Sequence, residues 1–304
     1  MRKKFSLNYG FGSTGISTLL ACGALAAAFQ AFDANATTSF SELPDMSQLT
    51  QFATFGNSWN LNLATVNGPA GISQSGTIAI SGPSTVNGNL YLGVGASKTG
   101  GGTVTGTTFT GANIYGTRNL TEAQAQVFSA SSTFAGMTAD KVINGNVSSS
   151  QIFGTANGVP DIQVLTINGN LSLGGSSGIT FVGDTGDVFV LNVTGTVSMG
   201  GSSFIGSLGQ AAMTIINLTS PGSLGTIADI NTKLNGTILI PNVTSATLHS
   251  VSGAIYSGFG QITLMSGATV NFIPFVPEPS TILTGALLML LPLGGCALRV
   301  VRKR

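Results

Sequence analysis

A short motif recurs along the chain and limits the fold more than any other feature of the sequence. An apolar residue, an Asn-Gly-Asn corner and an alternating strand follow one another at residues 86–93 and 167–174, with a less complete copy at 143–148. Asparagine and glycine adopt a positive φ at little cost, so each corner turns the chain sharply before the next strand. Corners at this frequency predict the coils of a parallel β-helix, in which each coil stacks on the next.

The rest of the central chain also consists of short segments in which apolar and polar residues alternate, which is typical of β-strands. Such segments lie at residues 77–81, 89–94, 163–167, 186–193, 237–240, 253–256 and 261–264. The corners are irregularly spaced, so we expect a mainly all-β fold, an irregular right-handed parallel β-helix with insertions. A β-sandwich is the main structural alternative.

One segment departs from the strand pattern. Thr121 and Gln124 form a capping box, which predicts a helix with Thr121 as its N-cap. Apolar residues recur at helical spacing at Leu120, Ala123, Val127, Ala130, Phe134 and Met137. We therefore expect one α-helix at 121–137 that packs its apolar side along the solenoid.

The composition argues against catalysis and against nucleic-acid binding. Only 7% of the 304 residues are charged and the formal net charge is +1, so no basic excess is present to contact phosphates. Both cysteines, Cys22 and Cys296, lie near the ends of the chain, which leaves the body without a disulfide or a thiolate. The single histidine, His249, alternates with Leu248 and is predicted to point outward. We expect a protein that is not an enzyme and has no cofactor.

Residues 1–36 have the three parts of a secretory signal peptide. A basic start precedes an apolar stretch at 16–29, and Ala34 and Ala36 then form the small-x-small pattern that signal peptidase accepts. We expect the Sec and signal-peptidase machinery to export the chain and remove this segment. An uncleaved membrane anchor and a lipoprotein signal at Cys22 are the less favoured alternatives.

The end of the chain is predicted to cross the membrane. Residues 281–298 are nearly uncharged, and a helix of this length, rising about 1.5 Å per residue, just spans a hydrocarbon core of roughly 30 Å. A basic tail that favours the cytoplasmic side follows at once, with Arg299, Arg302, Lys303 and Arg304. A proline and a glycine pair interrupt the span, which suits a temporary anchor. The signal peptide and this span together place the body, residues 37–275, outside the inner membrane.

A proline-rich motif stands directly before this span, and it consists of Val276, Pro277, Glu278, Pro279 and Ser280. The motif, the short span and the arginine-rich end make up residues 276–304, which resemble the PEP-CTERM protein-sorting signal of Gram-negative bacteria. This resemblance implies that an exosortase, a membrane-embedded transpeptidase, processes the tail. The protein would then reach the cell surface or the extracellular matrix, often alongside exopolysaccharide. A proline-rich linker before an ordinary tail anchor is the alternative.

Five segments of the body carry a resemblance to known proteins: 82–89, the predicted helix around 123–134, 188–193, 234–242 and 252–256. On these segments the body resembles two related families, the choice-of-anchor A surface domain and the ice-binding β-helix fold. The segments at 234–242 and 252–256 look most like choice-of-anchor A. The resemblance implies a β-helix with a companion helix and without catalysis.

Two groups of side chains are candidates for binding. Asp184 and Asp187 are closely spaced; a tight turn explains them best, whereas Ca²⁺ binding and paired-carboxylate chemistry on a sugar are less favoured. Threonines alternate with other residues along 103–110, a pattern that fits contact with ice or carbohydrate but more often marks the solvated side of a strand.

These observations favour a structural or adhesive protein of the biofilm or exopolysaccharide matrix, sorted by an exosortase. A ligand-binding β-helix, for ice or carbohydrate, is the alternative. A carbohydrate-active enzyme is the least favoured of the three.

Overall fold

A computed structural model describes residues 40–207, 213–219, 233–242 and 244–275. The predicted signal peptide and the predicted sorting tail, including Val276–Ser280, lie outside these residues. No helix within the described ranges is both long and apolar enough to cross a bilayer.

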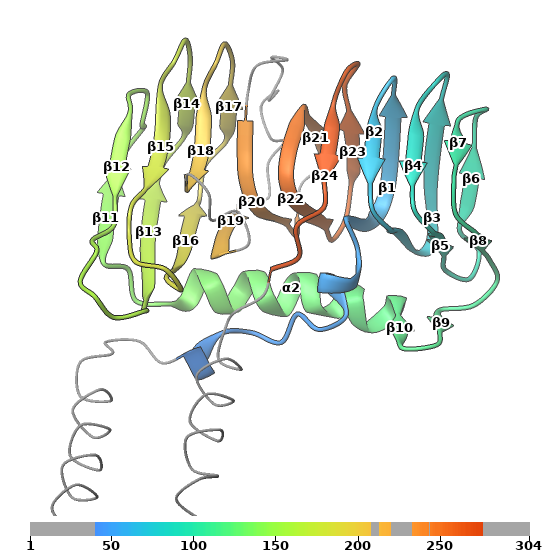
Figure 1. The fold of residues 1–304 in the computed structure, drawn as a ribbon, viewed down its shortest axis with the longest axis horizontal. Helices are drawn as coiled ribbons and strands as arrows, with labels where there is room; N and C mark the ends of the chain where they lie inside the picture. Colours follow the sequence, from blue (N-terminus) through green and yellow to red (C-terminus); the bar gives the residue numbers. More distant parts are fainter. Residues whose placement is uncertain (1–39, 208–212, 220–232, 243, 276–304) are drawn as a thin grey trace, which may run out of the picture. The chain divides into compact units, whose positions relative to one another are not determined.

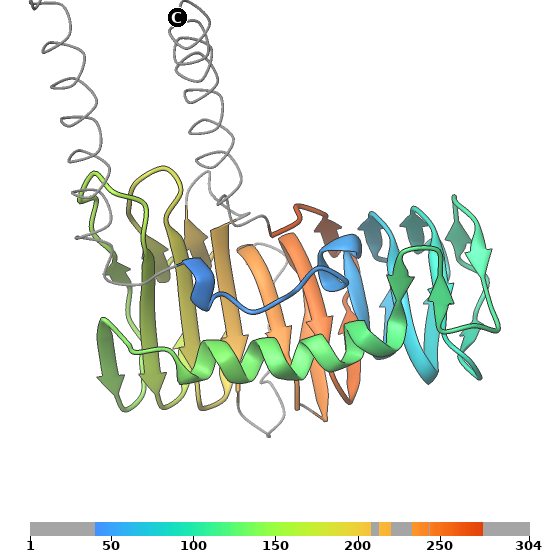
Figure 2. The same cartoon turned by 90° about the horizontal axis from the view of Figure 1, so that it is seen from below.

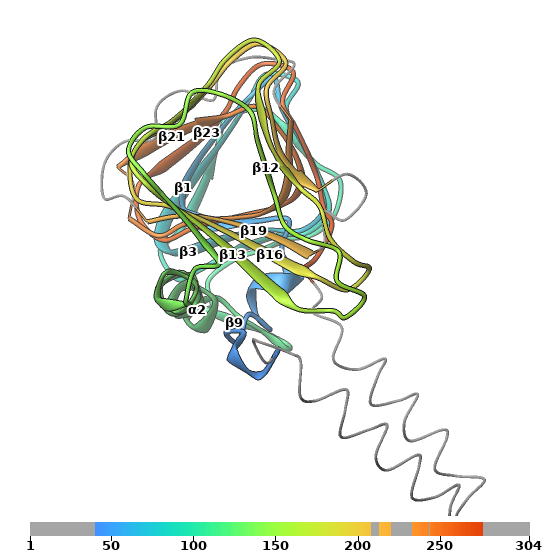
Figure 3. The same ribbon diagram turned by 90° about the vertical axis from the view of Figure 1, so that its left-hand side faces the viewer.

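The described chain is a parallel β-helix with one helix along its side (Figure 1). Twenty strands form one sheet, and the registered pairs within it are parallel, which argues against the antiparallel β-sandwich. Viewed end-on, each coil has three sides (Figure 3). The prediction of a mainly β fold with parallel sheets and one helix is confirmed.

The first side, which we call the helix face, lies against α2. It consists of β11 (Lys141–Asn144), β13 (Ile162–Asn168), β16 (Val188–Val193), β19 (Thr214–Leu218), β5 (Leu90–Leu92), β8 (Thr108–Phe109), the second halves of β20 (Lys233–Ile240) and β22 (Ser250–Ser257), and the starts of β1 (Thr54–Asn62) and β3 (Ala70–Ser81).

The other two sides carry no helix. The second face consists of β12 (Gln151–Phe153), β15 (Gly178–Phe181), β18 (Phe204–Ser207), β24 (Thr269–Asn271), β2 (Thr65–Asn67), β4 (Thr85–Asn87), β7 (Thr103–Val104) and the first halves of β20 and β22. The third face consists of β21 (Ser245–Leu248), β23 (Gln261–Leu264), β6 (Ser97–Thr99), the ends of β1 and β3, and the paired strands β14 (Leu171–Leu173) and β17 (Val197–Met199).

The order of the coils in space differs from their order in the sequence. Strands β1 to β8 build one end of the solenoid, and the chain then passes through the antiparallel pair β9 (Ile114–Tyr115) and β10 (Arg118–Asn119) into α2. After α2 runs along the helix face (Figure 2), strands β11 to β24 build inward from the other end. As a result β23 and β24, late in the chain, pair with β1 and β2.

Helix α2 (Leu120–Gly136) confirms the predicted helix, although its N-cap differs from the prediction. The cap is Asn119, whose side chain accepts hydrogen bonds from the backbone N–H groups of Thr121 (3.1 Å) and Glu122 (3.2 Å). Thr121 is therefore inside the first turn. Asparagine is among the best N-cap residues, and an N-cap stands one residue before the first helical position, as Asn119 does here.

Apolar burial and a polar network together hold α2 on the helix face. The apolar side that the sequence predicted packs against the outward residues of the helix face, among them Phe55, Val190 and Tyr256. Nearby, Asn217 is fully buried; its Oδ1 accepts from Ser131 Oγ (2.6 Å), and its Nδ2 donates to Asn192 Oδ1 (2.8 Å). Buried amides satisfied in this way fix the position of the helix as well as stabilising it.

Short 3-10 turns at η1 (Phe40–Glu42) and η2 (Leu49–Gln51) lead into β1. Gln126 of α2 accepts hydrogen bonds from the backbone N–H groups of Gln48 (3.0 Å) and Leu49 (3.3 Å). The start of the described chain is therefore tied to the middle of the helix.

Glycines stack at the corner between the second face and the helix face. A Cβ on Gly253 would lie 2.1 Å from the backbone oxygen of Gly236, and a Cβ on Gly88 would lie 2.6 Å from that of Gly68. Gly253 has a φ of +147°, which other residues rarely adopt. The close stacking of coils at this corner accounts for part of the glycine content of the chain.

A candidate binding face

The second face displays the same tripeptide in three neighbouring coils. Thr-Val-Asn forms β2, β4 and β24, and these strands lie in register, Thr65 opposite both Thr85 and Thr269. The central valines, Val66, Val86 and Val270, are fully buried in the solenoid. Because side chains alternate along a strand, each threonine and asparagine points outward.

Neighbouring strands extend the pattern on both sides. On β7, Thr103 lies opposite Thr85, and Thr105 follows two residues later. On β22, Ser252 lies opposite Asn271 and Ser250 stands two residues before it. Five coils therefore carry two outward rows of hydroxyl and amide groups, the first with Thr103, Thr85, Thr65, Thr269 and Ser250, and the second with Thr105, Asn87, Asn67, Asn271 and Ser252. We call these two rows the Thr–Asn array.

The array has a regular spacing that follows from strand geometry. Adjacent strands lie about 4.7–4.9 Å apart, and outward residues on one strand are separated by two residues, or roughly 6.6 Å. The array is thus a two-dimensional lattice of polar groups, set by the backbone and not by flexible loops.

Hydrogen bonds between asparagines hold part of the second row in place. Asn87 Nδ2 donates to Asn67 Oδ1 (2.8 Å), and Asn67 Nδ2 donates to Asn271 Oδ1 (2.9 Å). Each amide has two N–H groups and a carbonyl with two acceptor positions, so further hydrogen-bonding capacity stays directed to solvent. The row is therefore ordered before any ligand arrives, which lowers the entropic cost of binding.

No member of the array is charged or aromatic. Lys233 and Phe204, on the next strands of the second face, mark its end. The third face also has two outward rows, the first with Ser245, Gln261, Ser58, Thr77 and Ser97, and the second with Thr247, Thr263, Asn60, Ala79 and Thr99. It is less regular than the Thr–Asn array, because Gln261 is longer than its neighbours and Ala79 carries no polar group.

The structure divides the threonine segment that the sequence singled out. Thr103 and Thr105 belong to the second face, whereas Thr108 lies on β8, which pairs with β5 on the helix face. Residues 103–110 therefore do not form one continuous strand with a single threonine side. The threonine row runs across the coils, perpendicular to the strands.

Asp184 and Asp187 close a tight turn. The backbone N–H of Asp187 donates to Asp184 O (3.2 Å), with Gly186 at a φ of +100°. The buried Asp187 carboxylate accepts from the N–H groups of Asp161 (3.0 Å) and Asp184 (2.6 Å) and from Gln163 Nε2 (2.9 Å). Burial raises the pKa of Asp187. Within the described ranges, no three His, Cys, Asp or Glu side chains are grouped to hold a metal ion.

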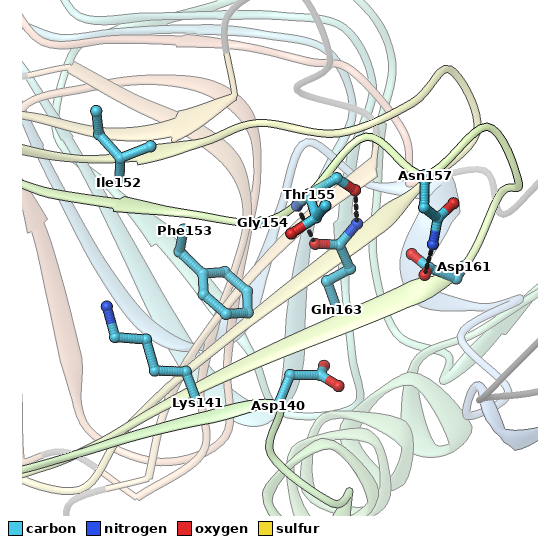
Figure 4. A pocket seen from close by; sticks show the side chains of 9 residues that line it. All are labelled: Asp140, Lys141, Ile152, Phe153, Gly154, Thr155, Asn157, Asp161 and Gln163. Carbon is cyan, nitrogen blue, oxygen red and sulfur yellow. Dashed lines mark hydrogen bonds between the residues drawn. The ribbon is translucent and has the colours of Figure 1, made fainter.

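A polar pocket of about 450 Å³ lies near this turn, at the coil formed by β11 and β12 (Figure 4). Asp140 and Asp161 line it, but each carboxylate has a structural partner: Asp140 Oδ2 accepts from the N–H of Val164 (2.7 Å), and Asp161 Oδ2 accepts from Asn157 Nδ2 (2.9 Å). Gln163 joins the pocket wall to Thr155 by two further bonds of 2.9 Å. These contacts shape the end of the solenoid.

His249 is buried, contrary to the prediction that it points outward. Its Nδ1 lies 3.0 Å from Ser250 Oγ and its Nε2 lies 3.3 Å from Ser266 O. The alternation with Leu248 does not continue because β21 ends at Leu248 and the chain turns a corner there.

No family model matches the chain, and no curated protein matches it. Several solved structures do match the chain. An ice-binding protein from the Antarctic ascomycete Antarctomyces psychrotrophicus is 19% identical, with 76% of this chain and 98% of that chain covered and a TM-score of 0.52. An ice-binding protein from an Antarctic biological consortium is 19% identical, over 77% of this chain and 93% of the other, with a TM-score of 0.51. A glycosylated ice-binding protein from an Arctic yeast is 17% identical, over 80% and 99%, with a TM-score of 0.51.

At these identities the likeness shows the fold alone. It confirms that the described residues form a β-helix of the kind found in ice-binding proteins, with one accompanying helix. The choice-of-anchor A and PEP-CTERM resemblances stay predictions.

Proposed function

We propose that the protein binds ice through the Thr–Asn array of the second face and has no catalytic role. The observation that carries this proposal is the regular, uncharged lattice of hydroxyl and amide groups over five coils. An ice surface is itself a periodic array of water oxygens, so a rigid periodic face can order and hold water where an irregular one cannot. The ice-binding proteins with the same fold support this choice.

The array suits ice better than a polysaccharide. Carbohydrate sites commonly include an aromatic ring that covers the apolar side of a sugar, and neither row of the array has one. The most direct test is whether the folded protein enters growing ice while Thr65→Tyr stays in the liquid.

Export and sorting complete the proposal. The signal peptide at 1–36 delivers the body across the inner membrane, and the exosortase acts at Pro277, Glu278 and Pro279. The span at 281–298 anchors the chain until then. The array is thus displayed at the cell surface or in the matrix, where it contacts ice or lies among exopolysaccharide.

Replacing Pro277, Glu278 and Pro279 with alanines is expected to stop sorting without affecting the body. The two prolines keep the segment extended and accessible, and without them the motif continues into the following helix. Fractionation and immunoblotting of the producing cells should show the variant retained in the inner membrane at its unprocessed size. A variant that reaches the surface at the normal size would refute the sorting proposal, and Thr281→Ala, just after the motif, serves as the matched control.

A further inference from the structure

Two hollows lie beside α2, on the side where the helix meets the corner between the helix face and the third face. The first has a volume of about 210 Å³ and is lined by Asn57, Gln74, Thr121, Gln124 and Phe259, among others. The second, of about 300 Å³, includes Phe128, Ser131, Ser132, Thr219 and Asn242 in its lining. Both belong to a surface separate from the Thr–Asn array.

An aromatic pair lies between the two hollows. The ring centroids of Phe128, on α2, and Phe259, in the turn after β22, are 4.9 Å apart with an interplanar angle of 43°. Phe259 is 60% exposed, although phenylalanine is usually buried. A Cβ on Gly258 would lie 2.5 Å from the Phe128 ring, so glycine is needed there for the turn to approach the helix. The Phe128 ring and the close approach of the Gly258 turn therefore hold the exposed Phe259 ring in place.

Gln124 lines the first hollow and carries a buried acceptor that has no partner among the described residues. Its Nε2 donates to Gly258 O (2.6 Å), and reversing the amide would set two oxygens against each other, so the orientation is fixed. Its Oε1 is buried and has no hydrogen-bond partner within the described chain. Buried polar groups are nearly always satisfied, and a small shift of the Gln124 side chain would let a ligand hydroxyl donate to this oxygen.

A strained bulge forms another part of the lining of the first hollow. The register of β1 and β3 shifts between Gly56 and Ser58, and in the extra segment Ser75 adopts a φ of +58°. Ser73 Oγ donates to Asn57 Oδ1 (3.3 Å) at the edge of the hollow. Backbone strain at a non-glycine residue costs free energy and is concentrated at binding sites. The bulge adds amide and hydroxyl groups to the same hollow that Phe259 lines.

We propose that the two hollows and the Phe128–Phe259 pair between them, which we call the groove, bind a neutral oligosaccharide. The exposed Phe259 ring covers the apolar side of one sugar ring, and the hydroxyl and amide groups of the two hollows bind the sugar hydroxyls. No residue that lines either hollow is charged, which disfavours an anionic glycan or a charged peptide. The first hollow is smaller than the roughly 300–1,000 Å³ of most small-molecule sites, which suits one sugar unit.

Calorimetric titration of the full-length protein, in a zwitterionic detergent that contains no sugar, tests the proposal. Cellohexaose and mannohexaose are the neutral probes, and an oligogalacturonate of similar length is the anionic one. At least one neutral probe is expected to bind, and Phe259→Ala is expected to weaken it about five- to tenfold by removing the stacking contact. Gln124→Leu should also weaken the binding of the same probe. Ile152→Ala, which removes a side chain 72% exposed at the far end of the solenoid, should change nothing.

Failure of both neutral probes to bind overturns the proposal, as does equal affinity of the wild type and Phe259→Ala. Sedimentation of the same samples gives an independent check, because a dimer that Phe259→Ala dissociates would identify the groove as a contact between copies of the chain. Thr65→Tyr, in the Thr–Asn array, should leave saccharide binding unchanged. The ice-binding proposal and the saccharide-binding proposal can therefore be supported or refuted independently of each other.

Discussion

Thr65→Tyr is expected to remove most of the ice-binding activity while the fold stays intact. Thr65 is central in the first row, with Thr85 and Thr269 on the neighbouring strands. A tyrosine there stands above the surrounding groups and keeps them from contacting an ice surface. Losing a central contact worth about 2 kcal/mol reduces binding more than tenfold, so we expect thermal hysteresis below about a tenth of the wild-type value.

The matched control is Thr77→Tyr, which makes the same change on the third face. Thr77 also points outward from the middle of a strand and lies opposite Ser58 and Ser97. Both variants should unfold within about 0.5 kcal/mol of the wild type, since neither changes the core. If Thr77→Tyr loses activity and Thr65→Tyr keeps it, the third face is the binding face and our assignment is wrong.

Gly253→Ala is expected to destabilise the solenoid by more than about 4 kcal/mol, a large part of the roughly 5–15 kcal/mol that stabilises a typical domain. The added Cβ would lie 2.1 Å from the backbone oxygen of Gly236, and the φ of +147° is strained for alanine. Backbone atoms of the adjacent coil cannot move aside without breaking the pairing of β20 with β22.

Urea unfolding followed by circular dichroism measures this effect. Gly101→Ala is the control, because a Cβ added there would have no other atom within 4 Å, and the φ of Gly101 is not in the left-handed region. We expect the control to unfold like the wild type. Equal stability of Gly253→Ala and the wild type would contradict the close stacking of coils at this corner.

The fold was predictable in kind because its local signals are strong. Asn-Gly-Asn corners and alternating strands indicated a β-helix, and the apolar spacing after Leu120 indicated α2. The order of the coils was not predictable, because no local signal says that β24 pairs with β2 across about two hundred residues of sequence. That pairing depends on the order in which all the coils stack in space.

The Thr–Asn array was not predicted from the sequence for the same reason. The repeated Thr-Val-Asn at 65–67 and 85–87 was visible in the sequence, and searching for it would also have found 269–271. A row that lies perpendicular to the strands takes one residue from each coil, so a search along 103–110 could find only two of its members. His249 shows the related limit, since alternation predicts orientation only until the strand ends.

The most direct test of the proposed function is partition of the purified protein into slowly growing ice. Ice that grows slowly from a stirred solution excludes ordinary solutes, so a protein found in the ice is bound to it. We predict that the folded wild type is enriched in the ice fraction, whereas Thr65→Tyr and an unrelated globular protein stay in the liquid. Wild-type protein that is folded by circular dichroism yet remains in the liquid would contradict ice binding by the Thr–Asn array.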